Sequence, residues 1–429
     1  MGEGYRSGAE KGARVLRDEP GIPGGLIPAI PGVTEPLADI APPLPVLQVP
    51  TPALPSPPFS ASNIKPKKIG YFWTGAGDNK HKDFLVATSL DDDTFGTVID
   101  IADVPTSGNS PHHLSPSTDG KTLLGGGLLS LLKTQDTAFY FDVSDPYRPK
   151  FLKSNRALLS SIVDEIRAKP DGGFFITYMG SAVGTSPAAS SRPTPTSTSS
   201  TILPHGLSID FEKDIILTSD FVVPLTVLKP SLGAKYANTL RLWNLSTRKI
   251  LSTITIPDCR RYRNRLDHLP FRTGPNGQPG TAELLYDLGD KAKNSVAIYS
   301  DISDDGKLAY FSITLGNHVA ALDISDLSNV KRLDDPNEQQ PIIGPHYVKI
   351  SPDKKNLLVT GYFVQGGDIS IFNTPGDYKA HWIDILDDGS LSFNRTIDFE
   401  SIFTRDRGGA RPHSSVIYDL TDPENPKYY

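Results

Sequence analysis

The chain has 429 residues, of which 38% are hydrophobic and 21% charged, with 37 glycines and 38 prolines. This composition indicates a globular protein rich in turns and favours β-structure over long helices. The formal net charge of -6 supplies no basic surface of the kind that follows a phosphate backbone, so nucleic acid is not expected as a partner.

The sequence also lacks the features of a membrane protein. No apolar run approaches the length of about 18 residues that spans a bilayer, and the opening MGEGYRSGAEKGARVL has no apolar core of a signal peptide. Cys259 is the only cysteine, which excludes an intramolecular disulfide and a cysteine-based zinc site. We therefore expect a cytoplasmic protein without membrane contact. Secretion is the alternative if the N-terminus is incomplete, and only on that route would the sequons at Asn244 and Asn394 matter.

Residues 1–64 are expected to form a Pro-rich N-terminal arm. The stretch IAPPLPVLQVPTPALPSPPF can neither enter a sheet nor hold a helix, because proline lacks a backbone N–H and fixes φ. Such an arm either lies extended over the folded body or is disordered. The remaining residues, 65–429, are expected to form one domain.

One unit recurs along residues 65–429. Its clearest copies begin PHHLSPSTDGKTLLGGG, PHGLSIDFEKDIILTSD and PHYVKISPDKKNLLVTGYF. Each copy is typical of an alternating strand, a tight polar turn and a second apolar strand, followed later by a third strand. His112, His205 and His346 each precede an acidic turn residue by seven positions, and Asp164 and Ile298 do the same.

These repeats predict an all-β fold, a seven-bladed β-propeller with a Pro-rich arm. His413 in ARPHSSVIYDL gives a sixth strand start, and the wide gap between His205 and Ile298 leaves room for a seventh. A β-sandwich does not explain the constant offset. KIGYFWTG and SSVIYDL are expected to share one blade and so remove the open edges. Residues 184–202 and 259–280 lack strand alternation and are either true loops or errors in the gene model.

A residue repeated at the start of each inner propeller strand forms a ring around the channel. The predicted ring contains His112, Asp164, His205, His346 and His413, with His113 beside it and Ile298 interrupting it. Three interpretations stay open: a structural strand opening, a copper or iron site with imidazole ligands, and a metal-free pocket for proton transfer on a small molecule.

Two further residues flank the same predicted face. Trp73 in GYFWTGAGD and Arg411 in GGARPHS are able to stack on a ligand or to pair with it. The alternative for a tryptophan in a strand is a place in the core.

Several segments together resemble the selenium-binding protein and methanethiol oxidase family, over residues 68–420. They are GYFWTGAGD, SPHHLSPSTDGKTLLGGG, FYFDVSDPYRPK, ISDDGKLAYFSITLGNHVAALDISD and ARPHSSVIYD. The resemblance implies a propeller and copper held by histidines, and His112, His113 and His413 match such positions. However, Asp164-Glu165-Ile166-Arg167 stands where the oxidases carry His-x-x-His, and the family's cysteines are absent. We therefore expect the protein to use no metal cofactor, with copper as the alternative.

PHGLSIDF and GPHYVKISPD resemble a fungal branch of this family that includes the hetero-Diels–Alderases of tropolonic sesquiterpenoid biosynthesis. This resemblance implies an enzyme that dehydrates a hydroxymethyl tropolone to an ortho-quinone methide and joins it to a humulene-type alkene. The alternatives are a copper-dependent thiol oxidase and a non-catalytic ligand-binding propeller. The expected catalytic residues are His112, His113, Asp164, His413 and Arg411, and the expected substrate-binding residues are His205, His346 and Trp73.

Overall fold

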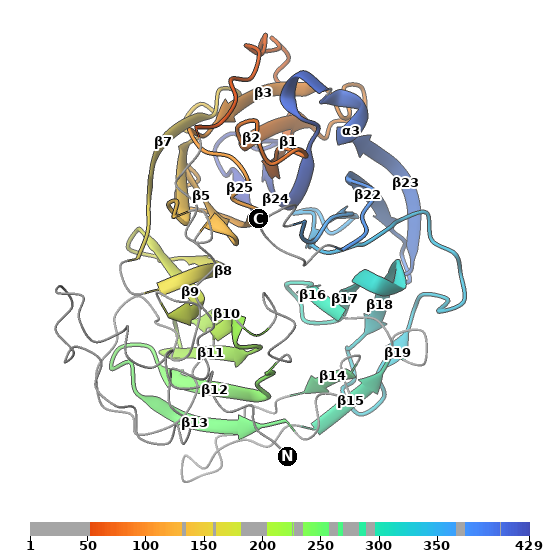
Figure 1. The fold of residues 1–429 in the computed structure, drawn as a ribbon. Helices are drawn as coiled ribbons and strands as arrows, with labels where there is room; N and C mark the ends of the chain where they lie inside the picture. The colour runs from red at the N-terminus through yellow and green to blue at the C-terminus, as the bar shows by residue number, and fades with distance from the viewer. Residues whose placement is uncertain are drawn as a thin grey trace, which may run out of the picture. The chain divides into compact units, whose positions relative to one another are not determined.

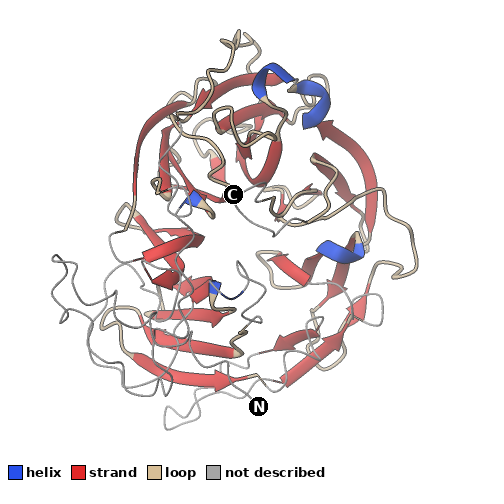
Figure 2. Ribbon diagram, in the orientation of Figure 1, coloured by secondary structure: helices blue, strands red, loops and turns tan. Residues whose placement is uncertain are grey.

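The computed structural model describes most of the chain after residue 51. The described ranges are 52–130, 134–157, 160–181, 204–224, 226, 235–256, 265–268, 283–288, 297–365, 374–403 and 405–429. Within them the backbone is dominated by β-strands, as Figure 2 shows, with short helical segments such as α3 (Phe399–Ile402). None of the helices in these ranges has the length and apolarity needed to cross a membrane.

The described strands form seven hydrogen-bonded sheets set around a common centre (Figure 1). Five of them have four or five strands and two have two strands. In hydrogen-bonded order, the first sheet is β25 (Lys427–Tyr428), β24 (Arg411–Asp419), β1 (Lys68–Gly75), β2 (Phe84–Ser89) and β3 (Val98–Asp103). The second sheet is β4 (Pro111–Pro116), β5 (Thr122–Gly127), β6 (Ala138–Asp142) and β7 (Lys150–Asn155).

The other three large sheets are built in the same way. One is β10 (Pro204–Asp210), β11 (Ile215–Asp220), β12 (Thr239–Asn244) and β13 (Ile250–Thr255). The next is β16 (Ala297–Ile302), β17 (Leu308–Ile313), β18 (His318–Asp323) and β19 (Lys331–Arg332). The last is β20 (Val348–Ile350), β21 (Asn356–Thr360), β22 (Lys379–Ile385) and β23 (Leu391–Asp398). The two small sheets pair β8 (Ser160–Ala168) with β9 (Phe174–Ser181), and β14 (Arg265–His268) with β15 (Glu283–Asp287).

The fold is thus an all-β propeller, but the prediction of seven blades is wrong, because only five sheets in the described residues are complete blades. Within the residues that the structure describes, the other two repeat units contribute a single hairpin each. The constant offset on which the prediction rested belongs to the inner hairpin alone and carries no information on the outer strands. The stretches without strand alternation, residues 184–202 and most of 259–280, lie outside the described residues.

The seven-residue offset has a local cause in the turn of each inner hairpin. In the first copy, Ser117 donates its hydroxyl to Asp119, and Asp119 accepts the backbone N–H of Lys121 at 3.1 Å. Gly120 follows with a φ of +65°, which a side chain would strain, and its carbonyl accepts the Tyr418 hydroxyl at 2.9 Å. The acidic residue therefore fixes the turn, and the length of the strand before it fixes where the histidine falls.

The ends of the propeller meet in one sheet, as expected. Strand β1 pairs antiparallel with β24, for example through Tyr71↔Val416 and Phe72↔Ser415. Because this pairing covers both edges, it leaves neither strand with unpaired backbone groups along that side.

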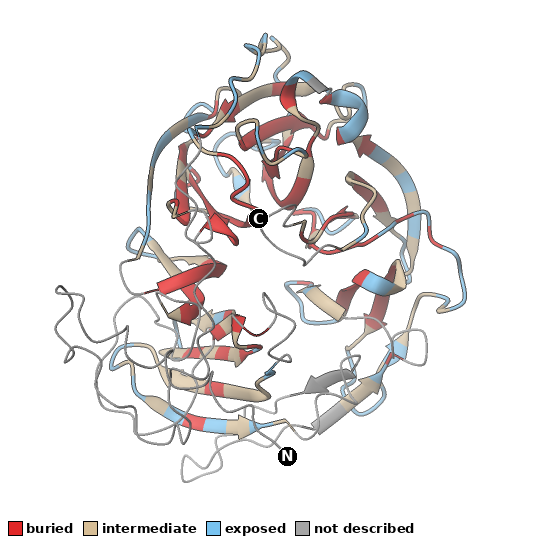
Figure 3. Ribbon diagram, viewed as in Figure 1, coloured by how far each residue is buried: buried red, intermediate tan, exposed pale blue. Residues whose placement is uncertain are grey.

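The hydrophobic core lies between neighbouring sheets, and buried residues line the inner strands in Figure 3. Successive side chains of β1 point to opposite faces. Trp73 packs against Phe139 and Phe141 of the β4–β7 sheet, with ring centroids 5.4 and 5.3 Å away. Phe72 packs against Phe399 on the other face at 5.0 Å. The sheet that contains β1 is therefore apolar on both faces, which fixes its position between the two neighbouring sheets.

Part of the predicted arm is described and lies against the first sheet. The N–H of Ser62 donates to Ile99 of β3 at 2.8 Å, and the Pro57 carbonyl accepts from Arg407 at 2.9 Å. Residues 1–51 lie outside the described residues.

Candidate functional site

The predicted ring residues converge because five inner strands carry a β-bulge at the predicted position. His112 and His113 together stand opposite a single residue of β5, and Asp164 and Glu165 stand opposite a single residue of β9. A bulge leaves one residue unpaired and changes the direction of its side chain. Two consecutive side chains of one strand therefore contact the same cluster.

Hydroxyl groups tie four of the ring histidines to the neighbouring sheet. In each case the hydroxyl of one blade donates to the backbone carbonyl of a ring histidine on the next blade. The pairs are Thr177 to His205 at 2.8 Å, Ser312 to His346, Thr360 to His413, and Ser414 to His112. These bonds satisfy buried carbonyls and hold the histidine backbones in place.

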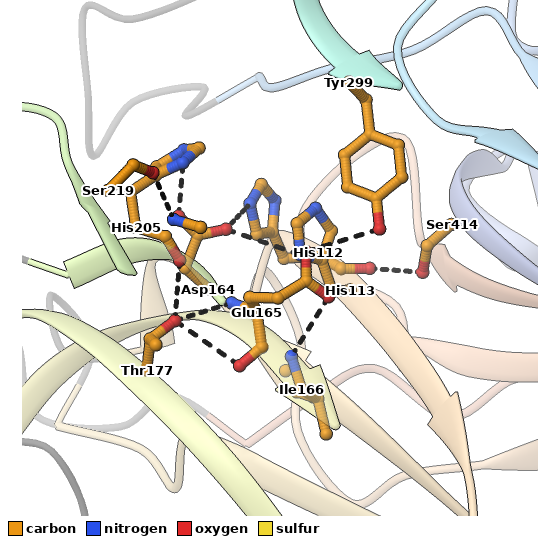
Figure 4. Close-up of polar contacts among 12 residues, drawn as sticks. His112, His113, Asp164, Glu165, Ile166, Thr177, His205, Ser219, Tyr299 and Ser414 are labelled. Atoms are coloured by element: carbon orange, nitrogen blue, oxygen red, sulfur yellow. Dashed lines mark hydrogen bonds and ion pairs between the residues drawn. The ribbon is translucent and has the colours of Figure 1, made fainter. Parts of the chain in front are cut away.

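Asp164 is the centre of the polar cluster (Figure 4). Its Oδ1 lies 3.1 Å from His112 Nε2 and 3.4 Å from His113 Nδ1, and its Oδ2 lies 2.9 Å from His205 Nε2. Complete burial alone would raise its pKa, yet His205 and His112 hold the pKa of Asp164 well below the ordinary value. Asp164 is therefore an ionised carboxylate that contacts histidines from two other inner strands.

His205 lies on the exposed side of this group. Its side chain is 25% exposed, whereas those of His112 and His113 are each 3% exposed. Burial of the ring opposes protonation, but the charge of Asp164 outweighs this effect and raises the pKa of His205 above 6.5. The cluster thus presents a stabilised imidazolium where solvent reaches it.

A second carboxylate, Glu165, extends the cluster toward β16. Its Oε2 lies 3.4 Å from His113 Nδ1 and accepts the Tyr299 hydroxyl at 3.3 Å, while its Oε1 is ion-paired with Arg167. Burial would raise the pKa of Glu165, but Arg167 and His113 lower it. Tyr299 also stacks on Tyr347 with ring centroids 4.4 Å apart. Glu165 is therefore a second buried anion, next to Asp164 in sequence.

His346 and His413 extend the cluster in the other direction. The His413 ring centroid lies 4.2 Å from that of His112 and 4.3 Å from that of His346. Neither His346 nor His413 makes a hydrogen bond of ordinary geometry through its ring to another described residue. Burial first, and then the nearby histidines, hold the pKa of both rings well below 6.5. Both are neutral imidazoles at physiological pH.

The rings of His112, His346 and His413 fit a metal ion that prefers imidazole ligands. One ring nitrogen of each lies within 4.8 Å of the others, and all three rings are buried. His112, His113 and Asp164 form a second group that meets the same distance. The copper ligands implied by the resemblance, His112, His113 and His413, are thus divided between two groups, because His113 contacts Asp164 and Glu165.

Two other predicted contact residues lie outside the cluster. Trp73 is completely buried between two sheets, and its Nε1 donates to the Gly126 carbonyl at 2.7 Å. Arg411 is ion-paired with Glu400, and its guanidinium lies 3.7 Å from the ring centroid of Tyr378. The structure therefore places Trp73 in the core and engages Arg411 in a separate group.

Sequence reasoning missed Glu165, Tyr299 and Tyr347, each of which directly follows a predicted ring position. Ile298 was expected to interrupt the ring, but the next residue, Tyr299, lies with its ring centroid 5.1 Å from that of His113. Glu165 and Tyr347 occupy the same place after Asp164 and His346. The His112-His113 pair was the available signal, since it marked two adjacent positions as polar.

Acid should destabilise the metal-free protein through the buried histidines. Burial lowers the pKa of His113 from 6.5 to about 4, so the unfolded chain binds a proton that the folded chain excludes. The stability due to this group is present above pH 6.5 and is lost as the pH falls toward 4, by about 3 kcal/mol. Between pH 7 and pH 4, the free energy of unfolding measured with urea should fall by about 3 kcal/mol less in His113→Gln than in the wild type. An equal loss in both proteins would contradict the assignment.

Comparisons with known proteins identify the fold. No protein-family model matches the chain, and no curated protein matches it. Among solved structures, it is similar to a hypothetical selenium-binding protein from Sulfolobus tokodaii, with a TM-score of 0.62 and 16% identity over 82% of this chain and 94% of that one. It also matches the periplasmic gluconolactonase of Pseudomonas aeruginosa, with a TM-score of 0.35 and 13% identity over 78% of this chain and 83% of that one. By its fold, the chain is a β-propeller similar to that of this hypothetical selenium-binding protein.

Proposed function

We propose that this chain is an acid–base enzyme that dehydrates a hydroxymethyl tropolone to an ortho-quinone methide and couples the product to a humulene-type alkene. The observation that supports it best is the separation of histidine protonation states within one cluster. Asp164 raises the pKa of His205, whereas burial lowers the pKa of His346 and His413. Environments that move pKa values apart within one cluster are typical of sites that carry out acid–base chemistry.

Dehydration needs both roles at once. The acid gives a proton to the leaving hydroxymethyl oxygen, the C–O bond breaks, and its electron pair leaves with water. The base takes the proton of the tropolone hydroxyl, and the electrons of that O–H bond complete the quinone methide. One water is lost, and no oxidant or reductant takes part.

His205 and His112 suit these two roles. His205 is held protonated by Asp164 and is exposed enough to meet a ligand. The ionised Asp164 only accepts hydrogen bonds, so His112 Nε2, 3.1 Å away, carries the proton. When Nε2 alone carries a proton, the lone pair of His112 lies on Nδ1, which is buried and without a hydrogen-bond partner among the described residues. Asp164 thus orients the base and stabilises the acid.

The coupling step needs orientation and exclusion of water. A cycloaddition transfers no proton, and holding two reactants in the right geometry can remove about 7 kcal/mol of its barrier. His346 and His413 are buried, so a quinone methide held against them would be protected from hydration.

The test is turnover by metal-free protein. After extensive chelation, the protein should accelerate loss of water from a hydroxymethyl tropolone and formation of the adduct with a humulene-type alkene, compared with buffer. Rates equal to those in buffer would overturn the proposal, and ligand binding without turnover would favour a non-catalytic propeller.

A copper-dependent thiol oxidase is the second candidate, and the group of His112, His346 and His413 favours it. Copper bound there would supply one-electron chemistry for oxidation of a thiol. The same preparation separates the candidates. The oxidase proposal expects one tightly held copper per chain and thiol oxidation that chelation abolishes, whereas the acid–base proposal expects dehydration that chelation leaves unchanged.

A further inference from the structure

An exposed aromatic pair lies beside His205 and takes no part in the core. Phe221 follows β11 directly, and its ring centroid lies 4.9 Å from that of His205, with the ring planes at 55°. Tyr236 lies beyond it, 5.9 Å from Phe221. The two aromatic residues are 38% and 36% exposed. The pair therefore continues outward from the exposed side of the cluster.

The backbone holds this pair in place without a ligand. Residues Val222 and Tyr236 form an antiparallel bridge, and the N–H of Ala237 donates to the Phe221 carbonyl at 2.7 Å. The N–H of Val223 donates to the Lys235 carbonyl at 2.9 Å. Side chains on a fixed backbone lose little conformational entropy when a ligand binds, so an aromatic face presented in this way favours binding.

We infer that Phe221, supported by Tyr236, is the face on which the planar conjugated ring of the substrate stacks beside His205. This inference rests on the proposed function and specifies how its substrate is recognised. Aromatic rings prefer offset or edge contacts with centroids about 4.5–7 Å apart, and such contacts discriminate flat π-systems from saturated rings. His205 adjoins this face, and because its Nε2 is paired with Asp164, its Nδ1 is the ring nitrogen left for an oxygen substituent of the ligand. The ligand class is therefore a flat conjugated ring that carries an oxygen substituent, as a tropolone does.

Binding of unsubstituted tropolone provides the test, since it needs no turnover. Calorimetry on metal-free protein should show binding about 10-fold weaker for Phe221→Ala and nearly unchanged for Phe221→Tyr, which keeps the aromatic face. Cycloheptanol, a saturated ring of the same size, should bind weakly to wild type and should not respond to Phe221→Ala.

Phe211→Ala is the matched control. Phe211 is 39% exposed and lies one residue after β10, at the end away from His205, about 20 Å along the strand. This change should leave tropolone binding unaltered. Equal binding by wild type and Phe221→Ala, or equal losses in the two alanine variants, would overturn the inference.

Failure of the inference and failure of the proposed function give different results. If tropolone binding depends on Phe221 but hydroxymethyl tropolone is not dehydrated, the proposed reaction is refuted and the stacking face is supported. If Phe221→Ala dehydrates the substrate with an unchanged KM, the proposed reaction is supported and the stacking face is refuted. Absence of tropolone binding to wild type would overturn the ligand class.

Discussion

Asp164→Asn should lower kcat for dehydration by about 10³-fold, because one carboxylate serves both the acid and the base. An amide carries no charge, so the pKa of His205 loses the interaction that raises it. An amide also offers an N–H toward His112, which permits the tautomer with the proton on Nδ1. The measurement is single-turnover dehydration, with the pKa of His205 followed by NMR titration in the same protein.

Asp334→Asn is the control for loss of a buried aspartate that pairs with a histidine. Asp334 Oδ2 lies 2.6 Å from His318 Nε2, outside the cluster, and Asp334 is also ion-paired with Arg332. This variant should lose stability and keep its rate per folded molecule. If Asp164→Asn and Asp334→Asn had the same rate per folded molecule, Asp164 would have no catalytic role.

His205→Gln should lower the dehydration rate by about 10²-fold and remove the alkaline limb of the pH–rate profile. The raised pKa of His205 means that wild-type activity falls as the pH rises through that value, above 6.5, because the acid loses its proton. Glutamine keeps the backbone carbonyl that accepts from Thr177 but does not titrate. Rates measured from pH 5 to 9 check both expectations.

His381→Gln serves as the matched control. His381 is buried on β22 and lies 2.9 Å from Asp377, so it is an aspartate-paired histidine of another blade. Its replacement should leave the alkaline limb in place. An alkaline limb that persisted in His205→Gln would assign the acid to another residue.

The ring was predictable because the inner hairpin is encoded locally. A serine or aspartate turn fixes one end of the strand, so the residue seven positions earlier always falls at the same end, as His112 and His346 do. Sheet completeness was not predictable in this way, because outer strands vary in length and composition. The repeat therefore predicted which inner-strand residues meet at the centre, but its prediction of seven blades was wrong.

The β-bulges explain why some residues of the cluster were not predicted from the sequence. A strict two-residue alternation places neighbouring side chains on opposite faces, so Glu165 and Tyr299 were not expected beside Asp164 and His113. The sequence predicted ligand contacts for Trp73 and Arg411 only because both lie near the ends of strands. Their partners, Gly126 and Glu400, come from sequence-distant segments and were not available from local patterns.

The shared sheet of β1 and β24 has a consequence for biosynthesis. Ser414, on β24, bonds the carbonyl of His112 across 302 positions of sequence. At about 5–20 residues per second, a ribosome needs about 15–60 s to make that intervening chain. Throughout this interval the apolar strand KIGYFWTG has no β24 to cover its edge, and His413 is missing from the cluster. Nascent chains and chains truncated before β24 therefore lack the complete cluster and expose the edge of β1 to aggregation.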